Sequence, residues 1–156
     1  MSNEWKQPKA PPPPLFIGQS ERNLVKQVND ELIESVIGQT IFYYPIDIER
    51  TNFHDLYGEA VTKTFMPPIR VYALVEFDGI TTKYNTNIGL DKDSSVTIHF
   101  HKRRLTEDQD LYVREGDFVS YGSIYYEIVT LSEPKQMFGQ IDHKMEISAK
   151  CIRARE

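Results

Sequence analysis

The chain has 156 residues, of which 40% are hydrophobic and 26% are charged, a composition typical of one globular domain with its own core. The formal net charge is −5, which excludes overall positive charge as the driving force for nucleic-acid binding. The single cysteine, Cys151, excludes an intrachain disulfide, and no run approaches the roughly 18 to 20 apolar residues of a transmembrane helix. We therefore expect a protein of a reducing compartment that is neither secreted nor embedded in a membrane.

The first segment, residues 1–19, is expected to form an extended arm. It contains Pro8 and four consecutive prolines at 11–14, which favour polyproline II and cannot donate backbone hydrogen bonds. Apolar side chains flank this run: Trp5, Leu15, Phe16 and Ile17. They predict that the arm contacts a partner or a neighbouring subunit. The alternative is a chain terminus with only local packing.

Segment 20–37 is predicted to be an amphipathic helix, because its apolar residues recur every three or four positions. They are Leu24, Val25, Val28, Leu32, Ile33, Val36 and Ile37. Ser20 is expected to cap the helix, and Gly38 to end it in the left-handed conformation. The helix opens a single mainly β domain, residues 20–156, whose strands begin at about residue 39 and form a small barrel or sandwich.

Runs rich in β-branched and aromatic residues, several with alternating apolar and polar positions, predict six strands. They are residues 41–44, 69–77, 96–101, 117–121, 124–131 and 144–152. Gly122 and Ser123 predict a hairpin turn between two of them, and Asp78 and Gly79 predict another turn after residue 77. In strand 69–77 we expect the odd-numbered residues to face the core.

We predict two long loops, residues 45–68 and 80–95. The first contains Pro45, Gly58, Pro67 and Pro68, and the second is rich in Thr, Asn, Asp and Ser. Long loops on a small sheet scaffold are common sites of partner contact. Tyr57 and Met66 in the first loop, together with Phe138 beyond Pro134, are the expected contact residues.

Two histidines, His99 and His101, share one face of a predicted strand, a spacing that many metal sites use. No third ligand is evident, because His54 and His143 are distant in sequence and lie near no Cys or Glu cluster. We therefore interpret this face as a polar outer surface and expect no metal.

The basic run Lys102, Arg103 and Arg104 is a candidate contact for DNA or an acidic partner. The alternative is that these charges pair with acidic residues that follow at once, such as Glu107 and Asp108. The nine tyrosines also leave two interpretations, namely exposed side chains at interfaces or rings whose hydroxyl groups reach water at the sheet surface.

No catalytic motif is evident: there is no glycine-rich phosphate loop, nucleophile elbow or zinc-binding helix motif. Two pairs of carboxylates, Asp47 with Glu49 and Glu115 with Asp117, are interpreted as loop charges and turn formers. Cys151 lies on an apolar strand face, where a thiol is usually unreactive. We expect neither enzymatic activity nor a cofactor.

Several short motifs follow one another along residues 39–152. They are Phe42-Tyr43-Tyr44-Pro45, Asp55-Leu56-Tyr57-Gly58-Glu59, Lys63-Thr64-Phe65, Phe77-Asp78-Gly79, Val96-Thr97-Ile98, Arg114-Glu115-Gly116-Asp117, Phe138-Gly139-Gln140 and Ile147-Ser148-Ala149. Their order and spacing resemble the neck proteins of contractile-tailed bacteriophages, which are also called head-completion or head-to-tail connector proteins. The arm, residues 1–19, lies outside this resemblance.

The resemblance implies a virion structural protein that is assembled in the host cytoplasm. In that family's role, it would form a homo-oligomeric ring, expected to be a hexamer, between the portal or adaptor protein and the tail terminator or tail tube protein. The ring would close the DNA-filled head, offer the platform for tail docking and enclose a channel for packaged double-stranded DNA.

Two other classes of function remain as alternatives. The first is a small β-barrel module that binds single-stranded nucleic acid, favoured by Lys102, Arg103, Arg104 and exposed tyrosines but opposed by the acidic net charge. The second is an enzyme of unrecognised type that uses His99 and His101 as ligands or bases.

Overall fold

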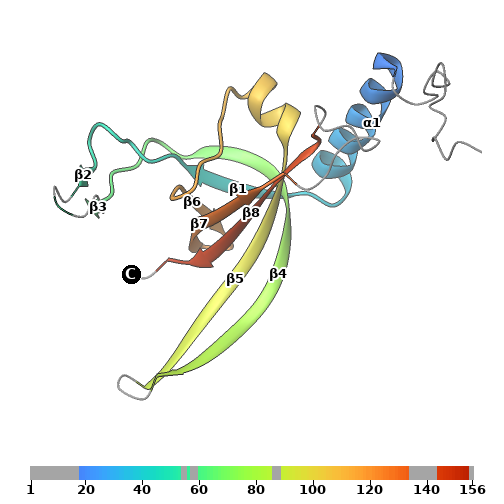
Figure 1. Cartoon of the computed structure of the whole chain (residues 1–156). Helices are drawn as coiled ribbons and strands as arrows, with labels where there is room; N and C mark the ends of the chain where they lie inside the picture. Colours follow the sequence, from blue (N-terminus) through green and yellow to red (C-terminus); the bar gives the residue numbers. More distant parts are fainter. Residues whose placement is uncertain (1–17, 54–55, 57–59, 86–88, 134–143, 155–156) are drawn as a thin grey trace, which may run out of the picture.

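The computed structural model describes residues 18–53, 56, 60–85, 89–133 and 144–154. These residues form a mainly β fold, a closed antiparallel barrel of six strands with one helix at its N-terminal end (Figure 1). The predicted fold class is confirmed, and the structure selects the barrel over the sandwich. Residues 1–17 of the predicted arm lie outside the described residues.

The barrel strands are those that the sequence predicts, some of them longer. They are β1 (Gln39–Tyr44), β4 (Ile69–Asn85), β5 (Gly89–His101), β6 (Phe118–Tyr121), β7 (Ile124–Ser132) and β8 (Glu146–Arg153). Their order around the barrel is β1-β4-β5-β8-β7-β6, and β1 pairs with β6 to close it. Ser123 and Gly122 have positive φ angles in the tight turn between β6 and β7, as the predicted hairpin requires.

The core fills the barrel because alternate residues of each strand point inward. Ile41 and Tyr43 of β1 are fully buried, as are Ile98 and Phe100 of β5, and the rings of Tyr43 and Phe100 meet edge to face at 6.3 Å. The Tyr43 hydroxyl donates a hydrogen bond to the buried carboxylate of Asp117. Asp117 also accepts a hydrogen bond of 3.0 Å from the backbone N–H of Ile46, so it fastens β1 to the start of β6.

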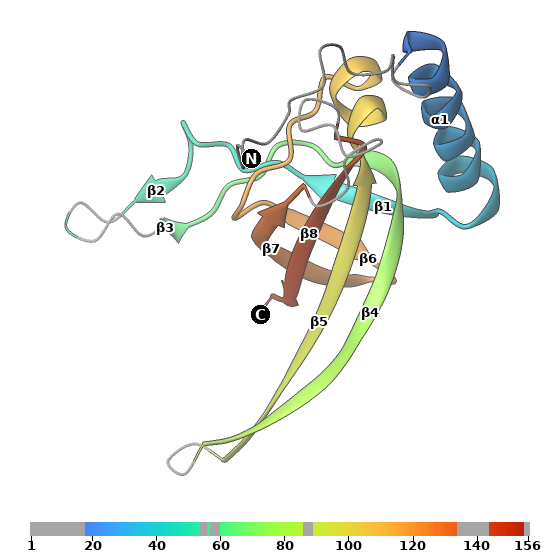
Figure 2. The same ribbon diagram turned by 45° about the vertical axis from the view of Figure 1, so that its right-hand side comes forward.

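The predicted loop at residues 80–95 is wrong for the described residues 80–85 and 89–95. There β4 and β5 pair as a two-stranded ribbon, which extends well beyond the barrel (Figures 1 and 2). Asp78 and Gly79 do not form a turn. The register shifts between Phe77 and Gly79, whose φ is 103°, so these residues form a bulge in a ladder that continues on both sides. Beyond the bulge, Thr81 and Thr82 favour a strand although they are exposed.

The predicted loop at residues 45–68 contains a small sheet of its own, formed by β2 (Asn52–Phe53) and β3 (Ala60–Thr62). This sheet extends from the barrel at the end of β1 (Figure 2). Asp47 orders the entry to it, because its carboxylate accepts hydrogen bonds from the backbone N–H groups of Glu49 at 3.1 Å and Arg50 at 3.3 Å. Part of this stretch is therefore regular structure rather than loop.

The predicted helix is present as α1 (Gln19–Glu31), which continues into a π-helical turn, η1 (Leu32–Val36). Both predicted ends were wrong in detail. Ser20 lies inside the helix, whose N-cap is Gly18 and has no side-chain cap. Gly38 does not adopt a positive φ; it is required instead because a Cβ there would lie 1.6 Å from the carbonyl oxygen of Ile33. No helix among the described residues is long and apolar enough to cross a membrane.

Candidate functional site

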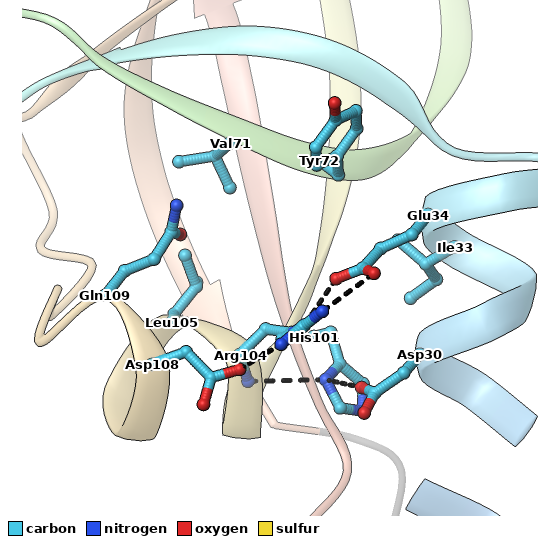
Figure 3. A pocket seen from close by; sticks show the side chains of 10 residues that line it. All are labelled: Asp30, Ile33, Glu34, Val71, Tyr72, His101, Arg104, Leu105, Asp108 and Gln109. Atoms are coloured by element: carbon cyan, nitrogen blue, oxygen red, sulfur yellow. Dashed lines mark hydrogen bonds and ion pairs between the residues drawn. The ribbon is translucent and has the colours of Figure 1, made fainter. Parts of the chain in front are cut away.

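The contact between helix α1 and the barrel is made largely by charged side chains. Asp30, Ile33 and Glu34 face the end of β5 and the π-helical turn η2 (Arg104–Asp108) that follows it (Figure 3). Among the described residues of α1 and η1, Ile33 is the one that is buried. The helix therefore turns a mostly polar stripe toward its own domain, the reverse of the usual arrangement of an amphipathic helix.

The basic run reaches this junction. Arg104 holds Glu34 through two hydrogen bonds, one of them 2.8 Å from Nη2 to Oε2, and it also pairs with Asp108. Arg103 pairs with Asp30. The hydrogen bonds from Arg104 hold the pKa values of the Glu34 and Asp108 carboxyls below their ordinary values, so both remain charged near neutral pH.

These pairs bear on the predicted DNA contact. The sequence alternative, pairing with the acidic residues that follow, is present for Arg104 with Asp108 and, at 3.8 Å, for Arg103 with Glu107. Asp30 and Glu34, in contrast, come from a distant segment. Lys102 Nζ lies 2.9 Å from Glu133 Oε1. Carboxylates therefore engage all three cations, which leaves less of their charge for phosphate, and a DNA contact by them stays a prediction.

The two histidines share the outward face of β5, but their surroundings differ. His99 Nδ1 lies 2.9 Å from Ser148 Oγ near the surface, whereas His101 is buried beneath α1, with Nδ1 2.9 Å from Asp30 Oδ1. The interpretation of a polar outer surface is therefore wrong for His101. Burial lowers the pKa of His101, against the opposing effect of Asp30. The part of the chain that the structure describes holds no group of three potential metal ligands.

A small cavity of about 210 Å³ lies between the helix and the barrel, lined by the ion pairs and by Val71, Tyr72 and Leu105 (Figure 3). Its described lining contains no Ser, Thr or Cys nucleophile. Cys151 lies elsewhere in the core, where burial raises the pKa of its thiol to about 12, so the thiol is protonated and unreactive. The ion pairs of the junction attach the helix to the barrel.

The apolar stripe of the helix faces away from the barrel. Its residues are Leu24, Val28, Leu32 and Val36, spaced four apart, with exposed fractions of 62%, 57%, 40% and 68%. We call these four residues the outer stripe. The sequence predicts that such a stripe exists, but it does not reveal that the stripe points into solvent.

A second exposed apolar surface lies at the far end of β1, where a shallow groove of about 630 Å³ is formed. It is lined by Tyr44, Arg50, Phe65, Met66, Pro67, Pro68, Phe118 and Tyr125, and we call it the aromatic groove. The rings of Phe65 and Phe118 lie 4.8 Å apart, and those of Tyr44 and Tyr125 lie 5.7 Å apart. Neither the predicted loops nor the predicted strands indicate this groove, because residues from five separate places in the chain build it.

Of the predicted partner-contact residues, the structure places one. Met66 is exposed and lines the aromatic groove. The others lie outside the described residues: Trp5, Leu15, Phe16, Ile17, Tyr57 and Phe138. Tyr112 and Tyr125 are exposed, whereas Tyr43 and Tyr126 are buried in the core, which neither interpretation of the tyrosines describes. The Tyr43 hydroxyl donates to the Asp117 carboxylate rather than to water.

Neither a scan against protein-family models nor a search of curated proteins gives a match. Among solved structures, the chain is similar to a chain of the "Virion of native gene transfer agent (GTA) particle". The TM-score is 0.45 at 8% sequence identity, with 74% of this chain and 94% of that chain covered. A likeness of this degree carries no argument about function.

Proposed function

We propose that this protein is a non-enzymatic structural subunit of a phage neck. In this proposal, copies of the chain form a ring between the portal or adaptor protein and the tail, close the DNA-filled head and provide the tail-docking platform. The observation that carries the proposal is that a small closed barrel presents two separate apolar surfaces, the outer stripe and the aromatic groove, at opposite ends of β1.

The exposed apolar side chains of the outer stripe and the aromatic groove favour assembly over an independent monomer. Soluble monomers rarely leave large contiguous apolar patches in water, and such patches commonly mark contacts with other proteins. A closed ring of identical subunits requires a head-to-tail contact, which joins two different surfaces of the subunit. The outer stripe and the aromatic groove supply two such surfaces.

The projecting ribbon of β4 and β5 supports the same proposal. Ile80 is exposed on it, beyond the barrel, where it adds nothing to the core, and Phe77 is exposed at the bulge where the ribbon begins. A two-stranded ribbon that reaches past its domain suits contact with a neighbouring component. The order of motifs along residues 39–152, which resembles that of phage neck proteins, supports the more specific parts of the proposal. These parts are the position in the virion neck, the portal and tail partners and the hexameric ring.

The test is the native mass of the purified protein over a range of concentrations, measured alone and then with the portal complex of the same virus. We expect a closed ring in at least one of these conditions. A strict monomer that ignores the portal and retards single-stranded DNA would contradict the proposal and favour the nucleic-acid-binding alternative.

The N-terminal arm gives a second test of assembly. A variant that lacks residues 1–17 is expected to keep the fold, because those residues contribute no strand to the described barrel, and to form the ring less readily. Circular dichroism would check the fold, and native mass would check assembly. Loss of folding would show that the arm belongs to the domain rather than to the interface.

A further inference from the structure

The orientation of α1 is fixed by its ion pairs. Glu34 and Asp30 lie on the side of the helix that faces Arg104 and Arg103, whereas the outer stripe lies on the opposite side. Turning the helix so that the stripe met the barrel would break both pairs and would bring apolar side chains against the charged groups. The subunit therefore cannot cover its outer stripe with its own barrel.

The stripe and the groove are complementary in kind, since one is an exposed apolar row on a helix and the other a mostly apolar hollow. From Leu24 to Val36 the stripe spans about 18 Å along the helix, at about 1.5 Å per residue. The aromatic groove continues into a neighbouring hollow of about 340 Å³, which shares Phe65, Phe118 and Tyr125 with it. A row of Leu and Val side chains set into an apolar concavity is the usual form of helix-in-groove recognition.

The charges around the two surfaces are also complementary. Among the exposed residues of α1 and η1, Glu31 is the charged one, and it adjoins the stripe. The edges of the groove carry Arg50, whose side chain is 79% exposed, and Arg153. Arg50 pairs with Asp47 at 3.5 Å, but its own side chain lies mostly in solvent, so the pair is weak and Arg50 can exchange it for another carboxylate.

From these three features we propose that the outer stripe of one subunit docks in the aromatic groove of the next copy of this chain. The inference rests on the proposed ring and identifies its repeating contact. Because η1 ends just before β1 and Tyr44 ends β1, the two surfaces lie on opposite sides of the subunit, so the contact is head to tail and repeats.

Cysteine cross-linking tests this contact in the full chain. Val28→Cys places a thiol on the stripe and Met66→Cys places one in the groove, both at exposed positions. The native Cys151 is buried and protonated, so it does not react with a bis-maleimide near neutral pH. We expect dimers from an equal mixture of the two variants, a ladder of multimers from the double variant, and neither product when Lys150→Cys replaces Met66→Cys.

Charge reversal provides an independent test. Glu31→Arg and Arg50→Glu should each weaken association about tenfold, and the double variant should recover it, because the pair is restored with its signs exchanged. Both side chains are exposed, so the thermal stability of the monomer should change little. If the double variant associates no more strongly than the single variants, the proposed pair between Glu31 and Arg50 is overturned.

The possible outcomes separate this inference from the proposed function. A closed ring without a link between Val28→Cys and Met66→Cys would overturn the docking and leave the ring role intact. Links in open chains alone would support the docking and count against the ring. A link between two copies of the Val28→Cys variant, or between this variant and the portal protein in the mixed sample, would show that something other than the groove covers the stripe. Either result would overturn the inference. A monomer without links under all conditions would overturn both.

Discussion

The barrel interior and the helix junction are held together by opposite kinds of interaction. Inside the barrel, Ile98 and Phe100 are completely buried among other apolar side chains. At the junction, Glu34 and Arg104 form a partly exposed ion pair instead. The barrel thus depends on the hydrophobic effect, whereas attachment of the helix depends on charge. The comparison teaches that an amphipathic helix can use its polar side for its own domain and keep its apolar side for another molecule.

The largest expected effect is in the barrel. Val71→Asp places a charge among buried core residues and should cost more than about 4 kcal/mol, enough to leave little folded protein. Phe77→Asp, with the same new side chain on an exposed position of the same strand, is the matched control and should keep its unfolding midpoint. Far-UV circular dichroism with urea titration measures both. A folded, soluble Val71→Asp protein would contradict the register of β4.

A smaller loss of stability is expected when the buried carboxylate of Asp117 is removed. Asp117→Ala removes the acceptor for the Tyr43 hydroxyl and the Ile46 N–H, and we expect a loss of about 2–3 kcal/mol. Glu115→Ala, which removes an exposed carboxylate that accepts a 3.1 Å hydrogen bond from Leu131 N–H, should cost less than half as much. Urea denaturation of both variants gives the comparison, and equal losses would mean that burial of Asp117 does not matter.

Acid should release the helix before it unfolds the barrel. Burial lowers the pKa of His101 below its ordinary value of 6.5, so the folded form favours the neutral imidazole. The stability that neutral His101 gives to the folded protein is therefore present above pH 6.5 and is lost as the pH falls through the folded-state pKa. Glu34 and Asp108 act in the same direction at lower pH, since their pKa values are also lowered.

Hydrogen exchange measures this difference between the two regions. Between pH 7.5 and 5.5, after correction for intrinsic rates, protection of the α1 amides should fall while protection of β5 remains. The groups that face His101 are Asp30 and Glu34 from the helix and Arg103 and Arg104 from its own segment, so the Arg104→Gln variant should show weaker protection of α1 at both pH values. If protection of the α1 amides rose on acidification, the lowered pKa assigned to His101 would be contradicted.

The smallest effect on monomer stability is expected on the outer stripe. Val28→Ser changes an exposed side chain and should alter the free energy of unfolding by less than about 0.5 kcal/mol. Ile33→Ser, on the buried side of the same helix, is the control and should cost clearly more. Thermal unfolding of both variants at low protein concentration checks this. Equal losses would show that the stripe is packed within the monomer.

The strands could be predicted where local pattern and burial agree. Alternation in segments 69–75 and 96–101, and the Gly122-Ser123 turn, sufficed because one face of each strand is buried in the barrel. Phe77, which was also expected to face the core, is 58% exposed. The ribbon at 80–85 and 89–95 was missed because a strand that leaves the barrel no longer needs an apolar face, so its alternation disappears.

The candidate site could be predicted only in part. The apolar stripe and the basic run are both visible in the sequence, but their relation depends on Arg104 meeting Glu34, 70 positions away. The aromatic groove likewise combines Tyr44, Phe65, Phe118 and Tyr125 from separate segments. Local patterns indicate which residues are apolar or charged, whereas long-range pairing decides which of them share a surface.

The pairing of β1 with β6 has a consequence for folding. Tyr43 and Asp117, which hold this closure together, lie 74 positions apart, and such non-local pairing typically forms slowly, in milliseconds to seconds. Until it forms, β1 and β6 both present unpaired edges, and the β6 of another copy offers β1 the same partner sequence. Refolding at low concentration should therefore yield closed monomers, whereas refolding at high concentration should also yield strand-exchanged dimers.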